Sequence, residues 1–530
     1  MNKLRHMVCL IALAGCVIAV SAINYPPENT AVTFLRTNLP IVFINTGATE
    51  ISRTERITAT MLIINNPTGL NYPDTIAYPN QHVDYRGYIG LRYRGTTSFE
   101  NSPKKPYSIH TLTAPYDRGG KKRKASLLGM PAENKWALLA AYSDKSLMRD
   151  MLAFQLARNY LPYAPDGRHC ELILDGTYYG VYILSELNTK GESRLDLPDP
   201  GESGDALTGG YYIGVDRQSD PHFRSAYRPR YADGTPYERR SIFFVYNWPD
   251  FEDLSTAQQT YIQSAVKTME DAINAPDFAD PDTGYARYIN VNSFVDYMLS
   301  TEFSHNVDGY RLSTGLFKRR DSDDLRFHAT IWDQNLGFGN ANYYEGYRTD
   351  TWIFRNNDLM IPNGEIYLIP FWWQRLLQDP AFGQRLLQRW RQYRHEACQT
   401  GHIMAVVDSI AGVLTADGAV QRNFDAWKLY NRHAWPNHYV APDFQAEVTY
   451  LKKWITDRLG FIDNHLPDLL PMPHGDLNGD HLVDIGDLNS LINILLARVA
   501  PTSVKGNPDL DHDGKTDIND INVLLNLLLQ

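Results

Sequence analysis

Apolar residues in the first part of the chain follow the pattern of β-strands. Four runs are rich in the β-branched and aromatic residues that favour strands, and they cover residues 39–45, 57–64, 87–93 and 105–112. Further along, Asp175-Gly176 separates the apolar runs 171–174 and 178–184, and Asp-Gly between such runs predicts a tight hairpin turn. The N-terminal part is therefore predicted to be rich in β-sheet.

Apolar residues in the later part recur at helical spacing. Met151, Leu152 and Leu156 share one side of a helix predicted over residues 149–160, and another helix is expected over 296–303. Beyond about residue 364 this pattern dominates, and helices are predicted over residues 370–378, 381–398, 403–414 and 446–466. The fold class predicted is α+β, with a β-rich N-terminal part (including a lead-in over 23–75) and a helical C-terminal part.

The first 22 residues are typical of a signal peptide. Lys3 and Arg5 precede an apolar run of 14 residues over 7–20, and small residues up to Ala22 suit cleavage after it. The run is shorter than the about 20 residues of a membrane span, so we expect secretion and no transmembrane span in the mature chain. A lipobox-like ending at Cys16 leaves an alternative, a lipoprotein anchored through that residue.

Two cysteines, Cys170 and Cys398, remain after that segment. They predict either one disulfide or two buried thiols, and the sequence does not decide between them.

Composition excludes some classes of protein. The chain is 43% apolar and 21% charged, which excludes a disordered chain and a multi-span membrane protein. The net charge of −10 argues against nucleic acid as a partner. The charge is uneven, because residues 476–530 contain nine Asp and no Glu.

These aspartates form a repeat with an offset of 33 residues. In two 12-residue segments, oxygen-bearing side chains fill positions 1, 3, 5, 9 and 12 and position 7 offers its carbonyl, which is the EF-hand pattern for Ca²⁺. The first set is Asp476, Asn478, Asp480, Leu482, Asp484 and Asp487. The second set is Asp509, Asp511, Asp513, Lys515, Asp517 and Asp520. We therefore predict two bound Ca²⁺ ions.

The repeat departs from an ordinary EF-hand in two ways. Position 12 is Asp where Glu is usual, and position 6 is Gly514 in the second loop but His481 in the first. A Leu/Ile-rich helix follows each loop, and prolines in the short linker 471–475 exclude a helix before the first. Loop–helix, connector, loop–helix over 476–530 resembles a type I dockerin, a small all-α domain. The resemblance implies a cohesin module of a scaffold or surface protein as partner.

Five motifs between Arg94 and Asn340 resemble the CotH kinase family and occur in its order. They are Arg94-Gly-Thr-Thr-Ser98 with Lys104-Lys105-Pro-Tyr107, the block from Lys135 to Arg149, Asp175-Gly to Glu186, Asn306-Val-Asp308-Gly to Thr314, and Trp332-Asp333 to Asn340. The resemblance implies an atypical protein-kinase-like domain over 76–470. It also implies phosphate transfer from ATP to a protein with Mg²⁺ or Mn²⁺.

The spacing of two aspartates fits phosphate transfer. Residues 310–318 and 326–332 are strand-like and joined by a polar turn, so a hairpin brings Asp308 and Asp333 near the same end. By analogy with protein kinases, Asp308 is the catalytic carboxylate beside the acceptor hydroxyl, and Asp333 is catalytic through the metal that it holds. Ser313 stands where a kinase has a metal-binding Asn, so Asn340 or Asn335 supplies that ligand, only one metal binds tightly, or the domain is inactive. Asn306 is also near.

Nucleotide contacts are assigned through the resemblance. Lys105 is predicted to reach the phosphates, with Lys104 as the alternative because neighbouring strand residues face opposite sides. Glu186 could pair with that lysine, and Arg94 and Ser98 could touch phosphate.

Alternatives from other functional classes stay open. The predicted secretion, and Ser313 in the place of a metal-binding Asn, favour one alternative. It is a catalytically inactive binding or structural module of a cellulosome-like, polysaccharide-degrading assembly. Paired acids such as Asp308 and Asp333 also occur in glycoside hydrolases. The basic run 118–124 predicts a solvated loop, with substrate docking as its alternative.

Overall fold

The computed structural model describes residues 32–529. The predicted signal peptide and the lipidation alternative at Cys16 lie outside the described residues. Cys170 and Cys398 are free and buried, which confirms two thiols in place of a disulfide. Burial raises the pKa of both thiols to about 12.

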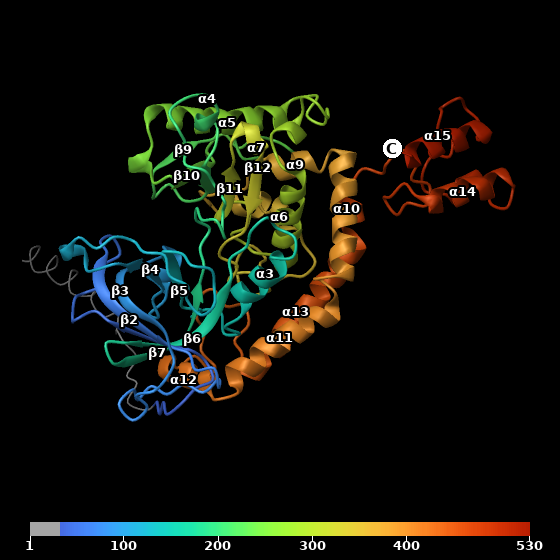
Figure 1. The fold of residues 1–530 in the computed structure, drawn as a ribbon. Coiled ribbons are helices and arrows are strands. Elements are labelled where there is room, and N and C mark those ends of the chain that lie inside the picture. The colour runs from blue at the N-terminus through green and yellow to red at the C-terminus, as the bar shows by residue number, and fades with distance from the viewer. Residues whose placement is uncertain (1–31, 530) are drawn as a thin grey trace, which may run out of the picture.

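Seven strands close into a barrel in the order β1-β2-β3-β4-β5-β7-β6 (Figure 1). The strands are β1 (Ile41–Asn45), β2 (Ile57–Ile64), β3 (Val83–Tyr93), β4 (Tyr107–Leu112), β5 (Lys135–Leu139), β6 (Gly167–Leu174) and β7 (Thr177–Ser185). The β1–β6 pair is parallel and the other pairs are antiparallel. The predicted β-rich lead-in thus supplies the first two strands of this barrel.

The β6–β7 hairpin turns where the sequence predicts. Asp175 and Gly176 both have positive φ, 49° and 77°, which suits an Asp-Gly pair in a two-residue turn. The Asp175 carboxylate also accepts hydrogen bonds from the Thr46 backbone N–H at 2.7 Å and from the Thr46 hydroxyl at 2.8 Å. The turn therefore fastens the end of β1 beside β6.

A second sheet of five strands lies next to the barrel in the order β12-β11-β8-β10-β9. Its strands are β8 (Tyr211–Val215), β9 (His222–Arg224), β10 (Phe243–Trp248), β11 (Thr314–Lys318) and β12 (Phe327–Thr330). β11 and β12 pair antiparallel, which confirms the predicted hairpin. A short helix, α7 (Asp321–Asp324), fills its connection.

Helices make up the C-terminal part, as predicted. The expected helices are α3 (Arg149–Ala157), α6 (Val291–Ser304), α9 (Trp372–Leu376), α10 (Pro380–His395), α11 (Thr400–Thr415) and α13 (Phe444–His465). The sequence pattern did not single out α5 (Thr256–Asn274) or α12 (Ala419–Trp427). No single helix among the described residues is long and apolar enough to cross a membrane; α10 and α11 meet that test only together, with a bend of 57° between them.

Two buried arginines connect α13 to the rest of the domain. Arg149 on α3 lies 2.6 Å from Asp144 and 2.9 Å from Glu447 on α13. Arg458 on α13 lies 3.2 Å from Glu302, in the last turn of α6. Removing one partner of a buried ion pair typically costs about 3–5 kcal/mol, so these pairs fix α3 and α6 relative to α13.

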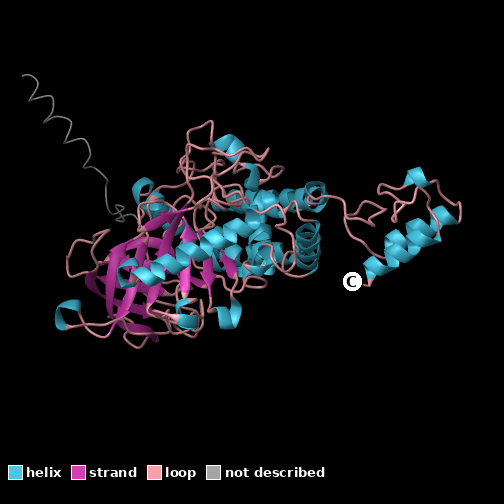
Figure 2. Cartoon of the chain, turned by 90° about the horizontal axis from the view of Figure 1, so that it is seen from above, coloured by secondary structure: helices cyan, strands magenta, loops and turns pink. Residues whose placement is uncertain are grey.

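The last two helices, α14 (Ile485–Leu495) and α15 (Ile518–Leu528), form a small unit that stands apart from the body (Figures 1 and 2). Its own core consists of Leu477, Leu491, Leu510 and Leu524. A hydrogen bond at 3.2 Å from Arg391 of α10 to the Asp480 carbonyl connects it to the large domain.

Candidate functional site

A cleft lies where the barrel meets the second sheet. It is lined by the loop between β3 and β4, the end of β5, the first turn of α3 and the segments after α6 and β12. Its polar lining residues include Arg94, Thr96, Thr97, Ser98, Asn101, Ser102, Lys104, Ser143, Asp150, Arg217, Asp308, Asp333 and Asn335. Of the predicted site residues, Arg94, Ser98, Asp308 and Asp333 therefore share one cleft.

Asn306 ties the two predicted catalytic aspartates together. Its side-chain oxygen accepts a hydrogen bond from the Asp308 N–H at 3.2 Å, and its amide donates to the Asp333 carbonyl at 3.0 Å. Asn306 is buried, whereas the Asp333 side chain is open to the cleft. Asp333 has a φ of 55°, so a non-glycine residue is held in the left-handed region at this point.

Four carboxylates, the carboxylate cluster, influence one another here: Asp150, Asp216, Asp308 and Asp333. Although the Asp333 side chain opens to the cleft, the protein packed around it limits its solvation; this desolvation, then the charge of Asp308, raises the pKa of Asp333. Burial, then the charge of Asp333, raises the pKa of Asp150 to about 8. Burial raises the pKa of Asp216 to about 6, with further contributions from Asp308 and Asp333. The upward shift of the Asp150 pKa favours its protonated form, and that form does not repel the Asp333 carboxylate.

Arginines offset part of this negative charge. Arg311 lies 2.6 Å from Asp308 and also contacts Glu365 at 3.1 Å. Arg217 lies 3.9 Å from Asp308. Arg94 stacks its guanidinium 5.0 Å from the centre of the Trp332 ring. Its buried Nη1 atom has no hydrogen-bond partner among the described residues, so Arg94 has a donor to offer a ligand in the cleft.

The loop that carries Arg94 depends on a glycine. Gly95 has a φ of 76°, and a Cβ built there would lie 2.2 Å from Ser98 Oγ. Only glycine therefore lets the loop fold back so that Ser98 reaches the cleft wall.

The structure separates the two candidate lysines. Lys104 lines the cleft and is fully buried, with Nζ bonded to the Val181 carbonyl and to Asn423 Oδ1 at 2.9 Å. Burial lowers its pKa well below the usual range. Lys105 is outside the described lining, and its Nζ donates to the Phe99 carbonyl. Lys104 is thus the lysine at the cleft.

Two other predicted residues have partners away from the cleft lining. Glu186 lies 3.5 Å from Arg194 and accepts a hydrogen bond from the Tyr163 hydroxyl at 3.3 Å, so it is not brought to either lysine. Asn340 is buried, with its side-chain oxygen accepting from Asn437 at 2.8 Å. Asn335 lines the cleft, and its side-chain amide nitrogen donates to Asp333 Oδ1 at 2.6 Å.

Sequence reasoning missed Asp150, Asp216 and Arg217. Asp150 directly follows the motif that ends at Arg149, so this acidic residue next to the motif was a usable signal in the sequence. Asp216 and Arg217 follow β8, and their part in the site depends on that strand pairing with β11.

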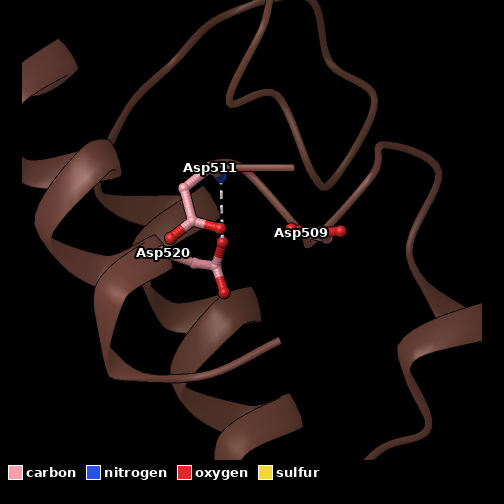
Figure 3. A group of neighbouring side chains, drawn as sticks. All are labelled: Asp509, Asp511 and Asp520. Atoms are coloured by element: carbon pink, nitrogen blue, oxygen red, sulfur yellow. Dashed lines mark hydrogen bonds between the residues drawn. The ribbon is translucent and has the colours of Figure 1, made fainter. Parts of the chain in front are cut away.

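The repeat in the tail folds as two similar loops. The position-12 aspartates, Asp487 and Asp520, accept backbone hydrogen bonds from the start of their loops, at 2.7 Å from Leu477 and 2.6 Å from Leu510. Carboxylate oxygens of Asp509, Asp511 and Asp520 lie within 4.8 Å of one another (Figure 3). Such a set of hard oxygens fits Ca²⁺.

Left-handed backbone explains the exchange of Gly and His between the loops. In the first loop, Gly479 and His481 have positive φ at positions 4 and 6. In the second loop, His512 and Gly514 occupy the same two positions, again with positive φ. Each loop thus combines one glycine with one histidine, which is tolerated better in this region than most non-glycine residues.

Comparison with known families agrees with this architecture. The family model described as CotH kinase protein matches residues 91–462, and the model described as dockerin type I domain matches residues 474–529. No curated protein matches the chain. The fold and the matches define a kinase-family protein that carries a dockerin. The chain belongs to the CotH kinase protein family and ends in a type I dockerin domain, a kind of domain that generally binds calcium and cohesin modules.

The tether formed by Asn306 gives a stability prediction. Asn306→Ala leaves the buried Asp308 N–H and the Asp333 carbonyl without this partner, so the free energy of unfolding should fall by about 1–3 kcal/mol. Urea unfolding followed by tryptophan fluorescence measures the change. Asn464→Ala, which removes an exposed hydrogen bond at 2.7 Å, is the control and should change stability by less than about 0.5 kcal/mol. Equal effects of the two substitutions would show that Asn306 ties nothing together.

Proposed function

We propose that the large domain is an atypical kinase that transfers phosphate from ATP to a protein, and that its barrel and helical part form a kinase-like fold. The observation that carries the proposal is the cleft that Asp308 and Asp333 share with Arg94, whose buried Nη1 atom has no hydrogen-bond partner among the described residues. Phosphate transfer needs carboxylates for a metal and for the acceptor, together with cations for the phosphates.

The donor set at Asp333 fits Mg²⁺ or Mn²⁺. Asp333 is open to the cleft and offers the hard carboxylate oxygens that these ions prefer. Asn335 donates its amide nitrogen to Asp333, so a turn of its side chain would be needed to bring its amide oxygen to the metal. Asn335 takes the place in which Asn340 is predicted, because Asn340 is hydrogen-bonded to Asn437. When bound, the metal neutralises charge on the transferred phosphate.

Asp308 is suited to receive the proton of the acceptor hydroxyl. Arg311 donates to one of its oxygens at 2.6 Å and so orients the carboxylate. The second oxygen lies 3.9 Å from Arg217, which is itself bonded to Thr97 at 3.2 Å. The acceptor thus meets a carboxylate that two arginines hold in place.

Arg94, Ser98 and Lys104 are proposed to contact the phosphates. Lys104 is buried with neutral oxygen partners, so an anionic phosphate next to it would raise its lowered pKa. This role falls to Lys104 in place of Lys105, because Lys104 lines the cleft and Lys105 is not among the lining residues. Glu186 has no part in it, because Arg194 holds its carboxylate.

Phosphate transfer tests the proposal directly. Purified full-length protein with Mg²⁺ or Mn²⁺ and labelled ATP should transfer phosphate to itself or to a generic protein acceptor such as casein. Asp308→Asn and Asp333→Asn should each lower the rate at least about 100-fold, because each removes a charge that the reaction needs. Asp457→Asn, at an exposed pair on α13, should keep the rate. Transfer that survives both cleft substitutions contradicts the proposal, and absence of transfer by the unaltered protein favours the inactive binding module.

The tail is proposed to bind two Ca²⁺ ions and to attach the kinase to a cohesin outside the cell. Dockerin proteins are typically extracellular or attached to the cell surface. Ile485 and Ile518 begin the two helices at equivalent places, and they are 64% and 63% exposed. Exposed apolar side chains at such positions fit a protein interface, so we assign these helix starts to the cohesin contact.

Removal of calcium should unfold the tail alone. Ligand carboxylates repel one another without the ion, so chelation should expose residues 476–529 to protease while 32–470 stays intact. Limited proteolysis with and without Ca²⁺ checks this. Asp476→Asn combined with Asp509→Asn should abolish the protection, and Asp468→Asn, exposed and paired with His465, should not. Identical cleavage with and without Ca²⁺ would falsify calcium binding.

A further inference from the structure

A second groove, called here the basic groove, lies at the other end of β5 from the cleft. Lys135 at the start of β5 lines the groove, and Leu139 at its end lines the cleft. Four strand steps of about 3.3 Å put the two sites about 13 Å apart along the strand. The groove's other charged lining residues are Lys122, Lys124, Glu133, Lys190, Glu192 and Asp196, and the Trp248 ring also lines it.

Four cations gather beside the groove around one buried histidine. His110 on β4 is surrounded by Arg56, Lys122, Lys135 and Arg92, and burial together with these charges lowers its pKa to about 2. Burial and repulsion from the other three cations also lower the pKa of Lys135. The carboxylate that opposes them is Asp250, 3.9 Å from Lys135.

Most other charges at the groove are paired. Lys124 lies 2.9 Å from Glu133, Lys190 contacts Asp199, and Asp196 lies 3.6 Å from Arg319. Glu192 also lines the groove, so Asp250 and Glu192 offset two of the four cations around His110. Two buried polar atoms have no hydrogen-bond partner among the described residues, Nδ1 of His110 and Nε1 of Trp248. The His110 side chain is only 8% exposed. Cations in excess and unused buried polar atoms thus meet in one place.

Backbone hydrogen bonds to β4 and the residue after it hold the basic run 118–124 in position. Thr113 N–H donates to the Lys121 carbonyl at 2.9 Å, and Arg123 N–H donates to the Thr111 carbonyl at 2.8 Å. These bonds hold Lys122 between them at the end of β4, opposite Leu112. The run is therefore fastened to the barrel, and its lysine belongs to the groove.

We propose that the basic groove binds an acidic peptide segment, and that this segment belongs to the protein that the kinase phosphorylates. Carboxylates of such a segment match the surplus cations around Lys135. A sugar ring would need a free aromatic face, but Lys135 and Lys190 lie over the Trp248 ring at 5.8 and 5.3 Å. The docking role rests on the proposed kinase function, whereas the binding itself does not.

Fluorescence anisotropy tests the binding with the calcium-loaded full chain and no nucleotide. The probe is a fluorescein-labelled 12-residue peptide of alternating Asp and Ser, and its Asn–Ser counterpart is the neutral control. Lys122→Gln with Lys135→Gln should weaken binding at least about 10-fold, because two charged contacts are lost. Lys452→Gln with Lys453→Gln on α13 removes the same charge from paired lysines and should change affinity less than about 2-fold.

The outcomes separate this proposal from the kinase proposal. The variant Lys122→Gln with Lys135→Gln, the groove variant, should keep its melting temperature, because removing Lys135 relieves repulsion among the cations. A loss of peptide binding in this variant then shows that the peptide binds in the groove. Equal weakening by both lysine variants, or tighter binding of oligogalacturonate than of the acidic peptide, overturns the proposal. Asp333→Asn should leave peptide binding unchanged even where phosphate transfer fails. If transfer occurs but the KM for an Asp-rich acceptor is the same in the groove variant, the docking role is wrong.

Discussion

Like charges gathered in one cleft are the constraint on which the rest of the structure depends. In the carboxylate cluster, loss of solvation raises the pKa values of Asp150, Asp216 and Asp333, and the charges of neighbouring carboxylates raise them further. Such a group is stable only when cations lie close by and the backbone is held firmly. Arg94, Arg217 and Arg311 supply the cations, and the remaining negative charge is what a metal ion would neutralise.

Helix α13 holds in place the backbone elements that carry the cleft carboxylates. Through Arg149 and Glu447 it fixes α3, which carries Asp150, and through Arg458 and Glu302 it fixes the end of α6, after which Asp308 follows. Helix α13 therefore fixes the positions of α3 and of the end of α6, the two elements that carry or precede Asp150 and Asp308. Carboxylates are also crowded in the tail, where the position-12 aspartate of each loop accepts backbone N–H groups. In the second loop, oxygens of three aspartates lie within 4.8 Å of one another.

Much of this arrangement can be predicted from local patterns. The Asp175-Gly176 turn, the β11–β12 hairpin and the two Asp-rich loops follow from residues close in sequence, and so does the meeting of Asp308 with Asp333. The closed barrel, the choice of Lys104 and the part played by Asp216 depend on pairings between distant strands, which no local pattern encodes. Burial, a tertiary property, likewise sets the pKa of Asp150.

The central claim is that the cleft holds a nucleotide through a metal at Asp333. A crystal structure of the full chain with Mg²⁺ and a non-hydrolysable ATP analogue measures this most directly. The account predicts a metal ion within about 2.0–2.1 Å of an Asp333 carboxylate oxygen, and phosphate oxygens beside Arg94 and Lys104. A nucleotide bound elsewhere, or a metal that does not touch Asp333, would contradict it.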